Sequence, residues 1–243
     1  MDEMDEMPYL ARGSWTRGQL STRLVPSTLV LDEGQRRQVE AAWMTACATP
    51  GRNLFDGPLC RLEGLTSSAG HLHLDVSVTS YQWFYGTNGE HPEWPQRADG
   101  VGTSAVLLTG DGWLLFGRRA ASLAFYPGWA HPFGGCLEPS ADIDLLTEME
   151  RELTEEIGLR PEEIDDLRCV GLVRTPKLQQ PELLYLAPTR LTRAVLEGRL
   201  DHHEHSACWG VRAEAASLDA ALRADDLTPV TRAVLRRYRE LLV

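Results

Sequence analysis

The sequence predicts an α/β sandwich built on a mixed β-sheet and preceded by a smaller α+β extension. Three patterns support this fold class. From residue 99 onward strand-like and helix-like segments alternate, a strand–turn–strand pattern opens this region, and two of its segments have the apolar periodicity of helices that cover a sheet. The 243 residues suit one main domain with an extension. We expect a disordered tail at 1–20, the N-terminal extension packed on the core at 21–98, and the main domain at 99–243.

The first hundred residues predict one helix and one clear strand. Residues 1–20 are acidic and then contain Gly and Ser without a period, which is typical of a disordered start. Residues 31–50 have a helical pattern that stops at Pro50. Residues 81–100 are aromatic and then rich in turn formers, so we expect a connecting loop. Residues 71–80 alternate strictly, as in a half-buried strand whose apolar face carries Leu72, Leu74, Val76 and Val78.

The region after residue 99 supplies the elements of the sandwich. Residues 101–119 read as a strand, a Gly-Asp-Gly turn and a second strand, which predicts a β-hairpin. A loop follows, and residues 144–157 then have the periodicity of an amphipathic helix. The remaining expected elements are strands near 168–175, 181–188 and 206–213, a short helix near 190–198, and two C-terminal helices.

The charge and the cysteines limit the classes of function. The net charge is −11 and the isoelectric point is near 5.1, so the surface does not attract nucleic acid or acidic membranes non-specifically. No apolar run is long enough to span a bilayer, and the first residues do not resemble a signal peptide. The five cysteines are odd in number and form no C-x-x-C pair. We therefore expect reduced thiols in a cytoplasmic protein.

The helix at 144–157 places its acidic residues beside its apolar stripe. One interpretation is a solvated acidic face with an intrahelical Arg151–Glu155 pair. The other is a site for a hard divalent cation such as magnesium, which prefers oxygen ligands. Glu156 lies nearest the apolar stripe, so its carboxylate should be the least solvated and most in need of a partner. The apolar stripe contains Leu145, Leu146, Met149, Leu153 and Ile157, and the acidic stripe contains Glu148, Glu152, Glu155 and Glu156.

The segment that runs from the preceding loop through this helix resembles the signature of the Nudix hydrolases. That signature is G-x5-E-x7-R-E-U-x-E-E-x-G-U, where U is a bulky aliphatic residue. Gly135 matches its opening, and residues 151–159 (RELTEEIGL) match its second half without a gap. From Gly135 to Arg151 the chain has two residues more than the family pattern. The positions of the expected glutamate are therefore Ala141 or Ile143. Asp142 or Asp144 could take its place, either as the N-cap of the helix or as a partner for Arg151.

The resemblance implies a fold, a cofactor and a set of metal ligands. Nudix proteins have an α/β/α sandwich and hydrolyse a nucleoside diphosphate linked to another group. Glu152, Glu155 and Glu156 would hold magnesium, or manganese in its place, and Arg151 would orient these carboxylates. Gly135 would contact the substrate, and Gly158 would cap the helix as part of the motif. Because members of this family often form homodimers, the resemblance also implies that a homodimer is possible.

Four further segments resemble members of this family that cleave UDP-glucose and UDP-galactose to UMP and sugar 1-phosphate. These segments are 54–62, 79–89, 101–119 and 204–212. By this resemblance Tyr81, Gly86, Thr87 and Asn88 lie close to the substrate. An aromatic ring there could stack on uracil, and polar side chains could bind a base edge or a sugar hydroxyl. The alternative is a structural aromatic cluster followed by a turn.

Other charged residues are candidates for binding and proton transfer. Arg118 and Arg119 end a predicted strand, so they face opposite ways and at most one can clamp a phosphate. Glu182 lies in an apolar strand and Glu204 precedes another, so either could serve as general base or additional ligand, together with catalytic Glu152 and Glu156. The histidines of "DHHEH" could suggest zinc, but no cysteine lies at ligand spacing. We expect His202, His203 and His205 to be solvated.

The favoured function is therefore magnesium-dependent hydrolysis of a UDP-sugar. One alternative is the same chemistry on ADP-ribose, a dinucleotide or a nucleoside triphosphate. A second alternative is a nucleotide-sugar sensor that keeps the fold without catalysis. In each case the partner is a small nucleotide.

Overall fold

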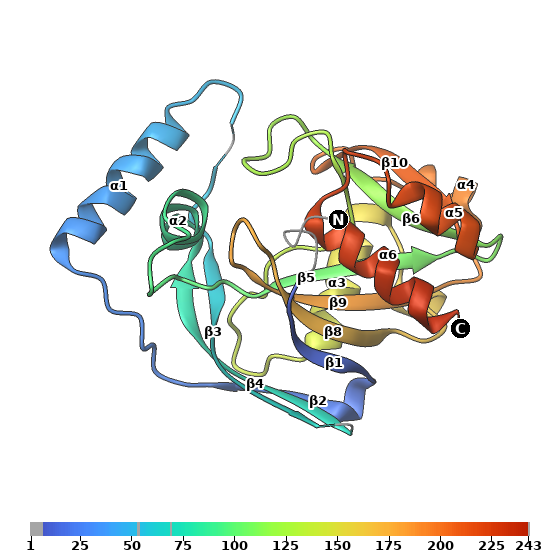
Figure 1. Cartoon of the computed structure of the whole chain (residues 1–243), viewed down its shortest axis with the longest axis horizontal. Coiled ribbons are helices and arrows are strands. Elements are labelled where there is room, and N and C mark those ends of the chain that lie inside the picture. Colours follow the sequence, from blue (N-terminus) through green and yellow to red (C-terminus); the bar gives the residue numbers. More distant parts are fainter. Residues whose placement is uncertain (1–6, 53, 69, 243) are drawn as a thin grey trace.

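Two β-sheets organise the chain in the computed structural model, which describes residues 7–52, 54–68 and 70–242 (Figure 1). The large sheet has the strand order β1-β8-β9-β5-β6-β10, with β7 paired to β6, and the small sheet has the order β2-β4-β3. The large sheet is mixed, because β5 and β9 are parallel whereas the other neighbours in it are antiparallel. Its strands are β1 (Tyr9–Trp15), β5 (Gly102–Leu108), β6 (Trp113–Arg119), β7 (Ala130–His131), β8 (Arg168–Arg174), β9 (Pro181–Pro188) and β10 (His205–Arg212).

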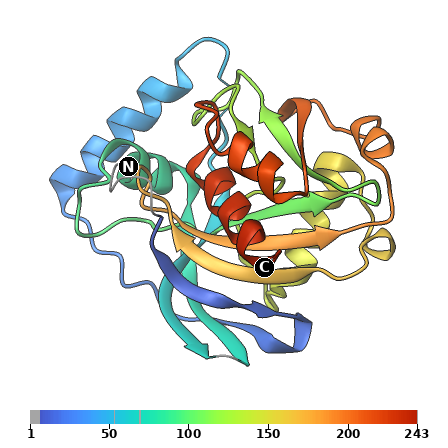
Figure 2. The same ribbon diagram turned by 45° about the vertical axis from the view of Figure 1, so that its right-hand side comes forward.

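Helices cover both faces of the large sheet (Figures 1 and 2). On β9, Leu183 and Tyr185 pack into the core that contains the apolar stripe of α3 (Leu145–Ile157). Leu184, between them, packs into the opposite core with α6 (Pro229–Leu241). Because successive strand residues point to opposite sides of a sheet, this alternation buries both faces of the sheet. The expected sandwich with a mixed sheet is thereby confirmed.

The elements after residue 99 follow the sequence-based expectations closely. The hairpin forms from β5 and β6, and Gly112 in its turn has a φ of 79°, which favours glycine. The strands β8, β9 and β10 and the helix α3 lie where the periodicity predicted them. The other helices of this region are the single turn η4 (Pro161–Glu163), the short α4 (Arg193–Glu197) and the two C-terminal helices α5 (Ala215–Ala221) and α6.

From residue 9 onward, the start of the chain is not the disordered tail that was expected at residues 1–20. Residues 9–15 form β1, the edge strand of the large sheet beside β8, and do not belong to a disordered tail. The Trp15 side chain is fully buried, and the Arg237 guanidinium of α6 donates a hydrogen bond to the Gly13 carbonyl at 2.9 Å. This pairing joins segments far apart in sequence, so local composition does not reveal it. Residues 1–6 of the expected tail lie outside the described residues.

The extension forms the small sheet and a helical layer beside it. It contains η2 (Arg17–Gln19), β2 (Leu20–Leu24), α1 (Glu33–Cys47), β3 (Pro58–Ser68) and β4 (His71–Ser80). Leu72, Leu74 and Val76 of β4 are buried in the same core as α3, whereas Val78 is exposed, so the predicted apolar face ends one position early. The first half of the expected loop at 81–100 is instead helical, with α2 (Tyr81–Phe84) continuing into a wider π-helical turn, η3 (Tyr85–Glu90). Residues 91–100 are turns and irregular structure, as expected.

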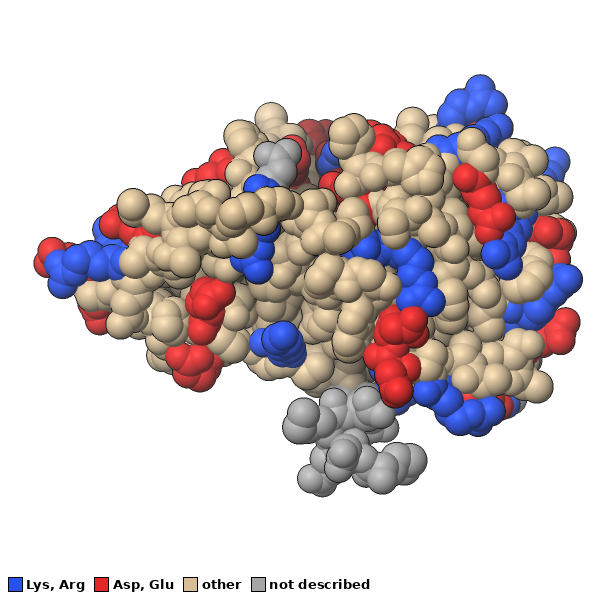
Figure 3. Space-filling model, turned by 90° about the horizontal axis from the view of Figure 1, so that it is seen from above, with Lys and Arg blue, Asp and Glu red and all other residues tan. Residues whose placement is uncertain are grey.

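Charged side chains are interspersed over the face seen from above in Figure 3. Charged residues on the described surface form many ion pairs, for example between Arg17 and Glu150 at 2.7 Å and between Arg199 and Glu163 at 2.8 Å. Within the described part of the chain, no helix combines the length and the apolar character that crossing a bilayer requires.

Candidate active site

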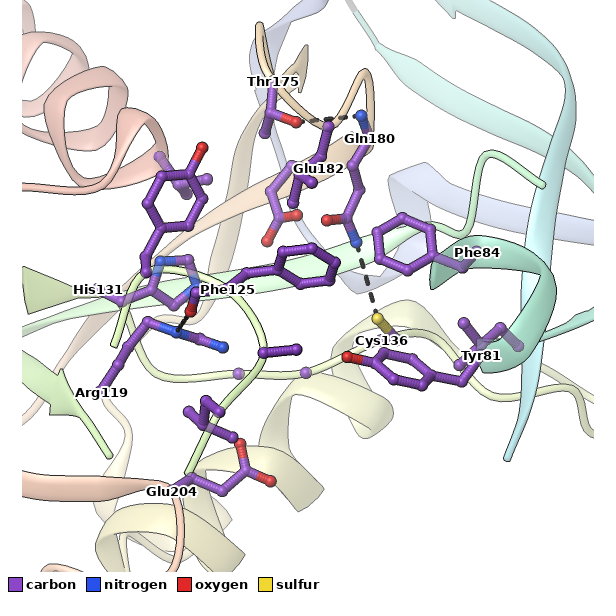
Figure 4. Close-up of a pocket in the computed structure, with 18 of the residues that line it drawn as sticks. Tyr81, Phe84, Arg119, Phe125, His131, Cys136, Thr175, Gln180, Glu182 and Glu204 are labelled. Atoms are coloured by element: carbon purple, nitrogen blue, oxygen red, sulfur yellow. Dashed lines mark hydrogen bonds between the residues drawn. The ribbon is translucent and has the colours of Figure 1, made fainter. Parts of the chain in front are cut away.

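A cavity of about 490 Å³ lies where the extension meets the loops at one end of the large sheet. Its lining comes from seven segments of the chain in five groups, so the fold and not any single motif builds it. These groups are residues 54–59 with Tyr81 and Phe84 of the extension, residues 119–126 after β6, residues 131–138 before α3, residues 175–182 leading into β9, and Glu204 with residues 228–230. Figure 4 shows how labelled residues from each group surround the cavity.

The glutamate helix α3 begins and ends as its sequence predicts. The Asp144 carboxylate is the N-cap and accepts hydrogen bonds from the backbone N–H groups of Leu146 and Thr147. Gly158 ends the helix with a φ of 60°, as expected for a glycine C-cap. Asp144 therefore has the capping role that was one of its two expected alternatives, and its ion-pair partner is Arg17 and not Arg151.

Arg151 forms ion pairs with three carboxylates of α3. Its guanidinium lies 3.2 Å from Glu148, 2.6 Å from Glu152 and 2.8 Å from Glu155. The expected Arg151–Glu155 pair is present, and the Glu155 side chain keeps 58% of its surface exposed. The Arg151 cation orients the carboxylates on one side of the helix, but it does not reach Glu156.

Glu156 is the buried carboxylate of this helix, and Glu152 is the next least exposed. Glu156 keeps 6% of its surface, and the Gly134 backbone N–H donates a 2.6 Å hydrogen bond to it, so it is the least solvated of the four glutamates, as predicted. Burial, followed by the neighbouring Glu204 carboxylate, raises the pKa of Glu156 well above its usual value. Burial likewise raises the pKa of Glu152 to about 7, although the Arg151 cation opposes this.

Two glycines give the loop before α3 its close approach to these carboxylates. Gly134 has a φ of 140°, and a side chain there would collide with the Thr103 carbonyl. A Cβ at Gly135 would lie 2.8 Å from a Glu152 oxygen. Gly135 therefore lines the cavity as predicted, and its missing side chain leaves room for the Glu152 carboxylate.

Glu182 of β9 supplies a second buried carboxylate. It is 4% exposed, and the Ser104 hydroxyl donates a 2.6 Å hydrogen bond to it. Burial raises the pKa of Glu182 to about 7, against the opposing effects of the Ser104 hydrogen bond and the Arg119 cation. Gly102 of the adjacent strand β5 pairs with Glu182, and any side chain there would collide with the carboxylate.

The segment before β10 places neighbouring residues in opposite environments. Glu204 lines the cavity, as expected for a candidate ligand or base. His205 is 1% exposed, which corrects the prediction that it is solvated; His202 and His203 are exposed. The His205 ring packs edge-on against Phe133, and its Nε2 lies 3.4 Å from the Glu156 carboxylate. The strand alternation of β10 begins here, which local composition did not reveal.

Of the two adjacent arginines, only Arg119 faces the cavity. Its Nε donates a hydrogen bond to the Phe125 carbonyl at 3.0 Å, and within the described residues it forms no ion pair. Arg118 faces away, where it pairs with Asp226 and lies 5.9 Å from the centre of the Trp209 ring. The prediction that at most one arginine of the pair could reach a phosphate agrees with this arrangement, and that arginine is Arg119.

An aromatic wall forms the side of the cavity opposite Arg119 (Figure 4). Tyr81 and Phe84 of α2 contribute to it, and their ring centres are 6.0 Å apart. Phe125, from the loop after β6, meets Phe84 edge-on with ring centres 6.2 Å apart. Burial raises the pKa of Tyr81, so its hydroxyl remains protonated and able to donate a hydrogen bond. Tyr81 is thus placed at the cavity as the sequence predicted.

Thr87 and Asn88 do not reach the cavity. Both are fully buried, and the Asn88 amide donates a 2.9 Å hydrogen bond to the Leu178 carbonyl and accepts one from the Asp99 N–H at 3.0 Å. Thr87 accepts a 2.8 Å hydrogen bond from the Ala98 N–H. Their expected place beside the substrate is wrong, because the unforeseen helical turn η3 directs these side chains inward to join the extension to the core.

Comparison with known proteins now identifies the family. Residues 99–237, more than half of the chain, match the NUDIX domain family. The chain belongs to the Nudix family. This match confirms the resemblance predicted from the signature, and it supports an enzyme of the pyrophosphohydrolase class.

The chain is also similar to curated Nudix proteins. Uridine diphosphate glucose pyrophosphatase NUDT22 of Mus musculus is 33% identical over 127 residues, which cover 44% of this chain and 41% of the mouse protein. The Homo sapiens protein of the same name is 34% identical over 128 residues, covering 44% of this chain and 42% of its own length. The aligned region thus spans about two fifths of these relatives. A mutT/nudix family protein of Listeria innocua has a solved structure that is similar at a TM-score of 0.45 and 19% identity, over 59% of this chain and 94% of its own.

Nudix enzymes generally use divalent metal ions, and the carboxylates of this site fit such a cation. Burial and neighbouring carboxylates raise the pKa values of Glu152 and Glu156, although Arg151 opposes this at Glu152 and Arg119 opposes it at Glu156, so a divalent cation would stabilise the charged form of both. Oxygen donors alone are the ligands that magnesium and manganese accept. As they stand, three acidic, histidine or cysteine side chains do not converge on one point anywhere in the described chain. Glu152 and Glu155 instead point to Arg151, so binding a cation requires their side chains to turn.

Sequence reasoning missed several residues of this Nudix cavity. His131 lines it beside Arg119, and Gln180 lies opposite, where its amide approaches the Cys136 sulfur at 3.7 Å. Phe125 completes the aromatic wall. His131 belongs to a strand of only two residues, and the others lie in loops, so no periodicity marks them.

Proposed function

We propose that this Nudix protein hydrolyses the diphosphate bond of a UDP-sugar, converting UDP-glucose or UDP-galactose to UMP and sugar 1-phosphate. One observation carries the proposal: a single cavity joins the Glu182 and Glu204 carboxylates to an aromatic wall supplied mainly by the extension, and the Gly134–Gly135 loop in its lining lies directly against Glu156 and Glu152. A diphosphate can lie near the carboxylates while a flat base reaches the wall. The similarity to proteins named uridine diphosphate glucose pyrophosphatase supports the same substrate.

In this proposal Glu152, Glu155 and Glu156 hold magnesium, for which manganese can substitute. A bound divalent cation neutralises the diphosphate charge and lowers the pKa of a water molecule. Glu156 needs this charge most, because it is buried and lacks an ion pair with Arg151. The Gly134 N–H orients the Glu156 carboxylate through its 2.6 Å hydrogen bond.

The other polar groups bind phosphate and accept the proton. Arg119 offers guanidinium N–H groups inside the cavity, where a diphosphate provides the anionic partner that Arg119 lacks among the described residues. Glu182 suits the role of general base, because its pKa of about 7 lets it gain and lose a proton near neutral pH. Glu204 borders the same space and is the second candidate for that role.

The aromatic wall provides the base site. Tyr81 and Phe84 come from α2, which belongs to the extension, so the region outside the matched Nudix segment contributes to substrate choice. Stacking on an aromatic face stabilises a flat base, and the Tyr81 hydroxyl can donate a hydrogen bond to it.

The decisive experiment compares turnover of UDP-glucose and ADP-ribose in magnesium, with the products identified. We expect UMP and glucose 1-phosphate from UDP-glucose at a higher kcat/KM than for ADP-ribose. A higher kcat/KM for ADP-ribose, a dinucleotide or a nucleoside triphosphate would reject the UDP-sugar and retain the Nudix chemistry. Replacing magnesium by manganese shows which ion supports the faster reaction.

A matched pair of variants tests the role of the carboxylates. Glu156→Gln should reduce magnesium-dependent turnover by several orders of magnitude with the fold intact. Glu150→Gln is the control, because Glu150 lies on the same helix but pairs with Arg17 away from the cavity. Binding of UDP-glucose without turnover by the unaltered protein would instead favour a sensor.

A further inference from the structure

His131 occupies the end of the cavity opposite the aromatic wall. It is the last residue of β7, where it pairs with Gly117 of β6. Its side chain lines the cavity, and Figure 4 shows it beside Arg119, across from Tyr81 and Phe84. The roles proposed above for the carboxylates and the arginine leave this imidazole without a function.

A chain of hydrogen bonds holds one nitrogen of the ring. The His131 Nδ1 lies 2.9 Å from the Thr228 hydroxyl, which is itself 2.9 Å from the Thr231 hydroxyl. The Thr231 hydroxyl donates to the Ala130 carbonyl at 2.7 Å, and the Thr231 N–H donates to the Thr228 hydroxyl oxygen at 3.2 Å. Both threonines are fully buried at the start of α6, so water does not compete for these bonds.

These bonds determine which ring nitrogen carries the hydrogen. The only hydroxyl hydrogen of Thr231 is committed to Ala130, so the 2.9 Å contact between the hydroxyls requires Thr228 to donate to Thr231. Thr228 then has no hydrogen left for the ring and must accept one from His131 Nδ1. A neutral imidazole with hydrogen on Nδ1 has a bare lone pair on Nε2.

The surroundings keep this imidazole neutral. Burial lowers the pKa of His131 well below its usual value, and the positive charge of Arg119 and the nearby His205 ring act in the same direction. A ring that resists protonation is a poor general base, because it cannot keep the proton that it removes. It remains a good hydrogen-bond acceptor through Nε2.

We infer that His131 is a specificity-determining residue whose Nε2 accepts a hydrogen bond from a hydroxyl of the sugar. This inference rests on the proposed function. With the base at the aromatic wall and the diphosphate at Arg119, the group beyond the diphosphate is the sugar, and it meets His131. Tyr126 also lines the cavity, and its buried hydroxyl has no hydrogen-bond partner among the described residues, so this lining offers a donor as well as an acceptor.

Two substrates and two variants test the inference. UDP-glucose carries the hydroxyls of glucose beyond the diphosphate. The ethyl ester of UDP has the same uridine and diphosphate but an ethyl group in place of glucose. For His131→Leu we expect kcat/KM on UDP-glucose to fall about tenfold, as for one lost buried hydrogen bond, and kcat/KM on the ethyl ester to change less than about twofold. His203→Leu is the control, because His203 is exposed and outside the cavity.

Each outcome decides between roles. Equal losses on both substrates, together with a changed acid limb of the pH–rate profile, would make His131 a base and overturn the inference while retaining the proposed function. No loss on either substrate would also overturn it. If the unaltered protein hydrolyses neither substrate, the proposed function fails and the inference fails with it.

A spectroscopic measurement tests the tautomer independently of activity. Long-range ¹H–¹⁵N NMR correlations of the ¹⁵N-histidine-labelled protein at pH 7 should show His131 neutral with its hydrogen on Nδ1, and His131→Leu assigns the signal. A protonated ring, or hydrogen on Nε2, would overturn the inference whatever the kinetics show. Thermal unfolding of His131→Leu near the temperature of the unaltered protein establishes that the fold persists.

Discussion

Replacing Glu182 by glutamine should stabilise the fold at alkaline pH while it lowers turnover. Glu182 is buried, and its pKa rises from the usual 4.5 to about 7. Between these values the unfolded chain has lost the proton that the folded protein retains. The free energy of unfolding therefore falls as pH rises through this window, and above it the folded state carries the full cost of a buried anion.

The magnitude follows from the two pKa values. A change from 4.5 to about 7 corresponds to roughly 3 kcal/mol at 25 °C. Glutamine never ionises, and its carbonyl can accept the same hydrogen bond from Ser104. The stability of Glu182→Gln relative to the unaltered protein should therefore rise by about 2–3 kcal/mol between pH 4.5 and pH 8.

Urea unfolding of both proteins at several pH values, with EDTA present to remove metal ions, measures this difference. The slope of free energy against urea should remain equal for the two proteins, so that the midpoints compare directly. A difference in stability that stays constant from pH 4.5 to pH 8, or that falls, would refute the account of Glu182 as a buried carboxylate with a raised pKa. Turnover measured at pH 7 shows the accompanying loss of function.

Three further predictions concern neighbouring positions. Arg119→Ala should raise KM for the diphosphate about tenfold or more, whereas Arg118→Ala should leave KM unchanged, and steady-state kinetics separate the two; equal effects would contradict the placement of these arginines. Gly102→Ala should displace the Glu182 carboxylate and lower kcat while the thermal midpoint shifts little, and an unchanged kcat would show that the strand accommodates the methyl group. Asn88→Ala should destabilise the fold by about 1–3 kcal/mol, because the buried Leu178 carbonyl and Asp99 N–H lose their hydrogen-bond partner. The kcat/KM per folded molecule should not change. A rise in KM without a loss of stability would instead show that Asn88 contacts the substrate.

Local patterns predicted most of the fold. The apolar positions that predicted strand β9 and helix α3 are the positions buried in the structure, because each element packs against a core along its whole length. The edge strand β1 was missed, because its pairing with β8 joins residues about 160 positions apart. The helical turn after β4 was missed as well, since four of its residues are held by tertiary packing and not by helix propensity.

The signature predicted the carboxylate side of the site better than the substrate side. Glu156 was expected to be the most buried glutamate of α3 because it borders the apolar stripe, and it is. Thr87 and Asn88 were assigned to the substrate from short resemblances, but the turn that carries them points into the core. His131 became visible only when Thr228, nearly a hundred residues later, fixed its ring.

The edge strand at the start of the chain limits how this protein can be divided. A fragment that began where the family match begins, at residue 99, would leave the backbone of β8 unpaired along its outer side. An uncovered strand edge of this kind pairs readily with other molecules. Such a fragment should aggregate on expression. A separate peptide of residues 7–16 would cover the edge of β8, but it would leave open the core face that the small sheet covers in the whole chain.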